Sequence, residues 1–181
     1  DVTIKLWSLP DWSLLRTLEV HTDKVNALAI SPDGKLLASG GGDPFINVWS
    51  LPDGALLRSL EGHSDMVISL VISSDGEILA SGGLDKTIKF WNLKSGELLK
   101  TMDADSQMVY LLKISQDGTM LVSDGVDGVK FWSFPEGNFL TLLEGSSIID
   151  VAPDWTLLAS GDGENSIKFW SLPDGELLKT F

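Results

Sequence analysis

Five tryptophans, Trp7, Trp49, Trp91, Trp132 and Trp170, recur along the chain at steps of 42, 42, 41 and 38 residues. Each closes a similar phrase, which reads TIKLW, FINVW, TIKFW, GVKFW and SIKFW in turn. A fixed period of this size is typical of a chain that repeats one supersecondary unit in tandem. The repeat therefore sets the architecture, and it favours an interaction scaffold over an enzyme with a single catalytic centre.

The second complete repeat shows the unit in full. Asp75-Gly76 and Ser95-Gly96 supply the positive φ angles that tight hairpins need, and a Gly-Gly connection leads to Asp85. No window shows sustained helical periodicity. Between these turns lie short runs rich in Val, Ile, Leu and aromatic residues, which suit strands better than helices: 66–72, 77–81, 87–91 and 97–102. The sequence therefore predicts a four-stranded antiparallel meander in each repeat.

Composition restricts the classes of partner. The chain of 181 residues is 43% hydrophobic and carries no cysteine, which suits a globular core and excludes disulfides and thiolate metal sites. Its formal net charge of −13 repels phosphate backbones and anionic lipid, so we expect neither a nucleic-acid partner nor a membrane partner. The two arginines, Arg16 and Arg58, lie 42 residues apart and do not form a phosphopeptide-binding cluster. A cytoplasmic location is the default expectation.

The phrases LEGH at 60–63, SSDG at 73–76, LASG at 79–82 and DKTIKFW at 85–91 resemble the WD-repeat (tryptophan–aspartate repeat) β-propeller family in order and spacing. The resemblance covers essentially the whole chain. The repeated motifs are similar to those in the WD-repeat arrays of bacterial proteins, cyanobacterial ones included. The aspartate that usually follows the tryptophan is absent. Its position holds Ser8, Ser50, Asn92, Ser133 and Ser171.

The resemblance implies an all-β propeller of four complete four-stranded blades after an N-terminal half blade, with the boundaries 1–18, 21–60, 63–102, 105–143 and 144–181. Four and a half blades do not close a ring in the usual way, so we expect a partial ring. If each open face left on the order of 400 Å² of apolar surface bare, about 10 kcal/mol of burial would be forgone. We therefore expect a segment of a longer protein or, alternatively, a ring completed by self-association through the open blade edges.

The resemblance to WD-repeat propellers also implies a buried hydrogen-bond relay, which in that family joins a His, a strand Ser or Thr, a turn Asp and the Trp indole. Two repeats match it in full, with His21, Ser39, Asp43 and Trp49 in one and His63, Ser81, Asp85 and Trp91 in the next. The third repeat keeps Ser123, Asp127 and Trp132 but has Asp105 in place of the His, and the fourth keeps Ser160 and Trp170 with Glu164 at the Asp position. We expect these last two blades to be less rigidly tied.

Catalytic and metal-binding alternatives have little support in the sequence. His21 and His63 occupy the same repeat position and are accounted for by the relay, and no G-x-S-x-G elbow or nucleotide-binding glycine loop occurs. The runs 124–127 and 162–165 place carboxylates close together, as calcium requires, yet both stand where blade turns are expected. We expect no catalytic residue, no cofactor and no metal, and an enzyme or metal-binding propeller remains a remote alternative.

Propellers of this family often bind partners on the loops before the first strand and before the relay Asp. These positions hold Lys24, Met66 and Met108 in the first set and Gly42, Leu84, Val126 and Gly163 in the second. The two middle blades thus place apolar residues at positions that are usually polar, and this set with Tyr110 suggests a protein-binding patch: Met66, Leu84, Met108, Tyr110 and Val126. The alternative is that these side chains fold inward and complete the core.

Together these features predict a non-catalytic scaffold for protein–protein interaction, the sensor or regulatory repeat segment of a larger protein. A purely structural assembly element that joins other copies through its open edges is the alternative.

Overall fold

The structure is a computed structural model that describes residues 2–19, 21–144, 147–161, 165–172 and 174–181, with the backbone alone at 147–149. Every regular element in these ranges is a β-strand. The strands form one two-stranded sheet followed by four four-stranded antiparallel sheets, so the predicted all-β fold of repeated meanders is confirmed. No helix in the described part of the chain is long and apolar enough to cross a membrane.

Each sheet follows chain order, with consecutive strands paired antiparallel. The N-terminal sheet pairs β1 (Thr3–Trp7) with β2 (Leu14–Glu19). The four complete sheets are β3 (Val25–Ile30), β4 (Leu36–Gly41), β5 (Ile46–Ser50) and β6 (Leu56–Leu60); β7 (Val67–Ile72), β8 (Ile78–Gly83), β9 (Thr87–Asn92) and β10 (Leu98–Asp103); β11 (Val109–Ile114), β12 (Met120–Gly125), β13 (Gly128–Ser133) and β14 (Phe139–Glu144); β15 (Ser147–Val151), β16 (Leu157–Gly161), β17 (Ile167–Ser171) and β18 (Leu177–Thr180).

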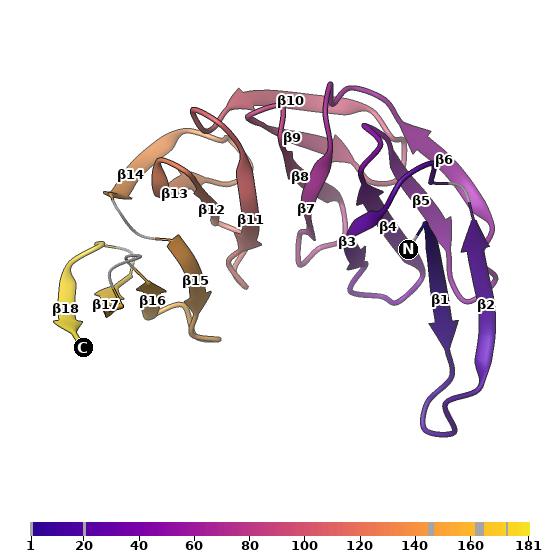
Figure 1. Cartoon of the computed structure of the whole chain (residues 1–181), viewed down its shortest axis with the longest axis horizontal. Coiled ribbons are helices and arrows are strands. Elements are labelled where there is room, and N and C mark those ends of the chain that lie inside the picture. The colour runs from indigo at the N-terminus through magenta and orange to yellow at the C-terminus, as the bar shows by residue number, and fades with distance from the viewer. Residues whose placement is uncertain (1, 20, 145–146, 162–164, 173) are drawn as a thin grey trace.

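The sheets follow one another along an open arc (Figure 1). The first strand of each complete sheet lies on the inner side of the arc and the fourth on the outer side, and the inner strands β3, β7 and β11 contact one another in sequence. The two chain ends lie at opposite ends of the arc and do not meet (Figure 1). The predicted partial ring is therefore confirmed, and each sheet is a blade of it.

The turn between the first and second strands of a blade has the same form in each repeat. Gly34, Gly76 and Gly118 adopt φ angles of 69°, 74° and 69° there, in the left-handed region that glycine enters without steric cost. In the fourth blade Trp155 takes this position with a φ of 55°. An L-residue with a bulky side chain is strained in this conformation, so Trp155 is an exception to the repeat.

The Gly82-Gly83 pair was predicted to form a connection after the second strand, and this prediction was wrong, because β8 continues through both glycines. Gly82 allows close packing between blades, whereas a Cβ on Gly83 would collide with the Met66 backbone oxygen of its own blade. A Cβ on Gly82 would lie 2.6 Å from Val109 Cγ1 of the next blade, and Gly40 meets Val67 in the same way at 2.7 Å. Glycine therefore lets the inner strand of one blade approach the backbone of its neighbour.

The core lies between blades as well as within them. One buried cluster joins Ala38, Val48 and Leu60 of the first complete blade to Val67 and Trp91 of the next. A second repeats the pattern one blade further, from Phe90 to Leu121 and Trp132. A single blade has two apolar faces and cannot bury both alone, so the blades depend on their neighbours for stability.

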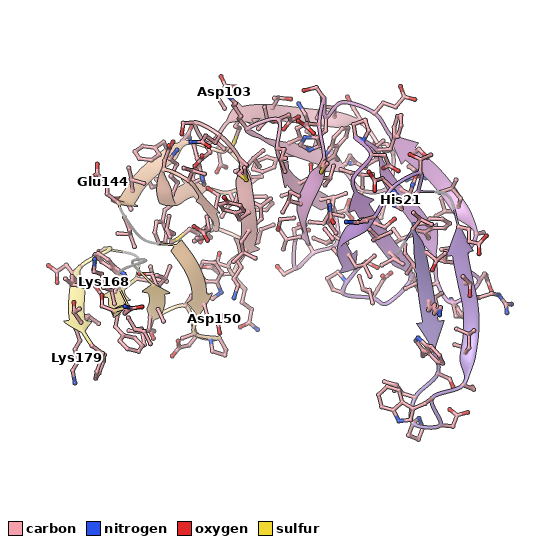
Figure 2. The ribbon with its side chains drawn as sticks, in the orientation of Figure 1. His21, Asp103, Glu144, Asp150, Lys168 and Lys179 are labelled. Carbon is pink, nitrogen blue, oxygen red and sulfur yellow. The ribbon has the colours of Figure 1, made fainter. Side chains whose placement is uncertain are left out.

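Polar contacts on the outer strands also link adjacent blades. Arg58 of β6 donates from Nη1 to the backbone oxygens of Leu93, over 2.9 Å, and of Lys94 in the next blade. Lys100 of β10, at the equivalent position, donates to the backbone oxygen of Glu136. On the inner side Lys113 of β11 forms an ion pair with Asp150 of β15, which Figure 2 labels.

Candidate functional site

The first relay lies inside the blade formed by β3–β6. The Trp49 indole Nε1 donates to Ser39 Oγ over 2.9 Å, and Ser39 Oγ lies 2.7 Å from His21 Nε2. His21, labelled in Figure 2, faces Asp43 Oδ1 from its Nδ1 at 2.9 Å. Because a carboxylate only accepts, Nδ1 carries the proton of this last bond and Nε2 accepts from the serine hydroxyl. The chain of bonds therefore runs from Trp49 through Ser39 and His21 to Asp43.

The second relay repeats this geometry in the next blade. Trp91 Nε1 donates to Ser81 Oγ over 2.8 Å, Ser81 Oγ lies 2.7 Å from His63 Nε2, and His63 Nδ1 lies 2.7 Å from Asp85 Oδ2. The backbone N–H of Ser64 adds a bond of 3.1 Å to the same carboxylate oxygen. The residues assigned to the relay in these two blades are thus brought together in the expected order.

Both relay carboxylates are buried and remain ionised. Burial pushes the pKa of Asp85 upward, but the hydrogen bond and charge of His63 outweigh it and hold that pKa well below its usual range. The pKa of Asp43 is lowered by the same balance, in which burial is opposed by His21 and by the Thr22 backbone N–H. These interior bonds satisfy an indole, a hydroxyl, an imidazole and a carboxylate that would otherwise be costly to bury. In both blades the four side chains are hydrogen-bonded to one another inside the blade.

The third blade keeps the indole bond and replaces the rest. Trp132 Nε1 donates to Ser123 Oγ over 2.8 Å. Lys130 Nζ lies 2.7 Å from Asp127 Oδ2 and 3.8 Å from Asp105 Oδ2, so a lysine pairs with the turn aspartate that an imidazole contacts in the two preceding blades. Lys130 and its hydrogen bond lower the pKa of Asp127, and Ser106 adds to the effect.

Sequence reasoning missed Lys130, and it also missed Asn47 at the equivalent strand position. Asn47 is buried, and its Nδ2 lies 3.3 Å from His21 Nε2. For Lys130 the available signal was the spacing between Asp127 and Trp132, which is one residue shorter than in the preceding blades and places the lysine closer to the turn.

In the fourth blade Trp170 Nε1 donates to Ser160 Oγ over 2.8 Å, while Glu164 lies outside the described residues.

The five candidate patch residues lie on one end of the blades, which we call the top surface. It carries the loops before each first strand and those between the second and third strands. The backbone N–H of Leu84 donates to the Met66 backbone oxygen over 3.0 Å, which holds these two loops together. Met66, Tyr110 and Val126 are 36%, 46% and 44% exposed, and Leu84 and Met108 are half-buried. None of the five belongs to a core cluster within the described structure.

The candidate cation sites do not gather ligands in the part of the chain that is described. No group of three or more His, Asp or Glu side chains there is suited to hold a metal ion. Asp124 is buried in β12, and Asp127 pairs with Lys130. Of the other acidic run, residues 162–164, Gly163 among them, lie outside the described residues.

Comparison with known proteins agrees with the repeat and the blades. The family described as WD domain, G-beta repeat matches residues 12–50 and 54–92. A stretch of 43 residues is 51% identical to the small ribosomal subunit protein RACK1y of Oryza sativa subsp. japonica, and it covers 24% of this chain and 13% of the rice protein. The family match and the meander blades lead to one conclusion. The chain contains WD repeats, matched at residues 12–50 and 54–92, and its other sheets have the same meander.

Proposed function

We propose that this chain is a non-catalytic scaffold for protein–protein interaction and that it acts as the sensor or regulatory repeat segment of a larger protein. The WD repeats and the similarity to the rice protein support the general role of a protein-interaction scaffold. The regulatory role, a cytoplasmic location and the resemblance to bacterial arrays stay predictions. The proposed binding surface is the top-surface patch of Met66, Leu84, Met108, Tyr110 and Val126.

The observation that carries this proposal is the position of the patch outside the core. Large apolar side chains scattered singly on a surface need no explanation, whereas a group on adjacent loops marks an interaction site. Here three of the five are exposed, two are half-buried, and none packs into the described core clusters. The inward-folded alternative would require Met66 and Met108 to join those clusters. The flexible thioethers of Met66 and Met108 suit contacts with a partner of variable shape.

The proposal is tested by selecting random displayed peptides against the chain and measuring their affinity for variants. The patch variant carries Met66→Ser and Met108→Ser. The control carries Leu98→Ser and Leu99→Ser, two exposed outer-strand residues away from the top surface. We expect the patch variant to melt near the wild-type temperature and to lose about tenfold in peptide affinity, because a truncated anchor residue costs more than about 1 kcal/mol. A large loss of thermal stability, or equal losses in both variants, would contradict the proposal.

Self-association is a second candidate, and the exposure of Trp7 favours it. Trp7 of β1 is 49% exposed, although Trp49 at the same repeat position is buried against its relay serine. A second copy that covers β1 would bury this indole. The solution mass by light scattering distinguishes the candidates, since a monomer at high concentration contradicts assembly and leaves the patch as the proposed site.

A further inference from the structure

Cavities recur at the lower end of the blades, opposite the top surface, where the turns between first and second strands of neighbouring blades face each other. One cavity of about 400 Å³ lies between the turn at Asp33 in the first complete blade and the turn at Asp75 in the second. Another of about 310 Å³ lies between the turn at Asp117 in the third blade and the turn at Asp154 in the fourth. Each cavity therefore has a carboxylate from both of its blades.

The first of these cavities contains a cation of the protein itself. Lys94 lines it, and the charges of Asp33 and Asp75 help to raise the pKa of this lysine after the larger effect of its ion pair with Glu77. The Lys94 Nζ lies 2.6 Å from Glu77 Oε1. In this cavity two turn carboxylates are therefore matched by one lysine.

The second cavity has carboxylates at the two equivalent turn positions, but no lysine or arginine lines it. Its walls are Ser115, Gln116, Asp117, Pro153, Asp154 and Trp155. No lysine or arginine in the described ranges forms an ion pair with Asp117 or Asp154. Both carboxyls are ionised, because the Ser115 hydroxyl first and then Thr119 lower the pKa of Asp117, and the Thr156 hydroxyl and backbone lower that of Asp154.

This cavity has no lysine in its wall, but it does have an indole, that of Trp155. Trp155 occupies the position of the turn glycine with a φ of 55°, and it is half-buried beside the core cluster of Val122, Phe131 and Leu158. At the equivalent Gly76 a Cβ would be directed toward Pro32 of the preceding blade, 3.6 Å away. A side chain at this position is therefore directed across the gap between the two turns. Aromatic faces attract alkylammonium and guanidinium groups, and two nearby carboxylates strengthen the attraction.

We propose that the cavity of Asp117, Asp154 and Trp155 binds a cationic side chain, lysine or arginine, of a partner protein. The ammonium or guanidinium group would lie between the two carboxylates, with its alkyl chain against the indole. A cavity of about 310 Å³ suits one such side chain. The choice of a protein as the source of the cation rests on the proposed scaffold function. The site is otherwise independent of the top-surface patch, because it lies at the other end of the blades.

The experiment is a titration of the ¹⁵N-labelled chain followed through the indole N–H resonances, with the Trp155 resonance assigned from a Trp155→Leu variant. The probes are the blocked tripeptides Gly-Lys-Gly and Gly-Arg-Gly, their norleucine counterpart, and free n-butylammonium. We expect the two cationic peptides to shift the Trp155 resonance and the norleucine peptide to bind at least about fivefold more weakly. Equal effects of the cationic and norleucine peptides would overturn the proposal.

Variants separate the contributions of charge and aromatic face. Asp154→Asn keeps an oxygen that can accept from Thr156, and Trp155→Leu keeps an apolar contact with the core, so both are expected to remain folded. Each should weaken the lysine peptide about fivefold, read for Trp155→Leu from the backbone resonances of Gln116 and Asp117. The Met66→Ser, Met108→Ser variant should bind the peptide as the wild type does. Unchanged affinity in Asp154→Asn and Trp155→Leu would contradict the site.

The remaining outcomes distinguish the source of the cation and the two proposals. If n-butylammonium binds as tightly as the lysine peptide, the site recognises free amines and the protein source is wrong. If the lysine peptide binds while selected peptides fail to depend on the patch, the lower cavity stands and the top-surface proposal fails. If the reverse is found, the scaffold proposal stands without this cavity.

Discussion

Lys130 Nζ lies 2.7 Å from Asp127 Oδ2 and also donates to the Ala104 backbone oxygen over 2.6 Å, so one lysine ties the strand β13 to two loops of its blade. In the two preceding blades a histidine makes the equivalent connection between loop and turn. The third blade thus has an ionic tie where it lacks the imidazole, and the expectation that it is less rigidly held stays a prediction.

The replacement of Lys130 by methionine tests the ionic tie. Lys130→Met leaves Asp127 and the buried Asp105 without a cation, and we expect the free energy of unfolding to fall by about 2 kcal/mol, since removal of one partner of a buried pair is costly. The measurement is urea denaturation. Lys113→Met is the matched control, because its partner Asp150 is exposed, and it should cost less than about 1 kcal/mol. Equal costs would contradict the structural role of Lys130.

The relay serine of the second blade gives a separate prediction. Ser81→Ala removes the acceptor of the Trp91 indole and the partner of His63 Nε2, and it leaves two buried polar groups without their bonds. We expect a loss of about 1–3 kcal/mol in the free energy of unfolding. The exposed Ser74→Ala in the neighbouring turn is the control and should be near neutral. A neutral Ser81→Ala would show that the relay adds no net stability.

The repeat phrases predicted the strands because each blade carries its own apolar runs and turn glycines, and these act locally. They could not predict Lys130, since the loss of His at position 105 indicates a gap in the relay but not what fills it. The continuation of β8 through Gly82 and Gly83 was also missed, because its cause is Val109 in the next blade. Likewise the cavity beside Trp155 depends on two turns that lie in different blades, so a reading of one repeat at a time does not show it.

The relay carboxylates predict a pH dependence of stability. A carboxyl group whose pKa is lowered by folding stabilises the fold above its unfolded value of 3.8, and this contribution is lost as the pH falls through the folded value. The free energy of unfolding should therefore fall progressively as the pH is lowered below about 4. Asp85→Asn should be less stable at neutral pH and should lose less on acidification than the wild type. The measurement is urea denaturation across this range, and parallel curves for both proteins would contradict the assignment.

Close packing between blades predicts the effect of a small enlargement. Gly82→Ala places a methyl group 2.6 Å from Val109 Cγ1, and we expect a cost of about 1–3 kcal/mol from overpacking. Val109→Ala alone should also destabilise, because it leaves a cavity. The double variant should be less destabilised than the sum of the two, since Val109→Ala makes room for the added methyl group and that methyl group fills part of the cavity. Simple additivity in a double-mutant cycle would mean that the two sites do not share this contact.

The outer-strand cations predict a graded contribution to the junctions between blades. Arg58→Met removes the hydrogen bonds to the backbone oxygens of Leu93 and Lys94, and we expect a loss of about 1 kcal/mol. Arg16 holds the same repeat position in β2 but donates to the Leu15 backbone oxygen of its own strand. Arg16→Met is therefore the matched control, with an expected cost below about 0.5 kcal/mol. Thermal unfolding checks the pair. If the two variants melt together, the link from Arg58 to the next blade does not stabilise the junction. If Arg58→Met alone melts lower, the cations on the outer strands act between blades, in parallel with the apolar contacts of the inner ones.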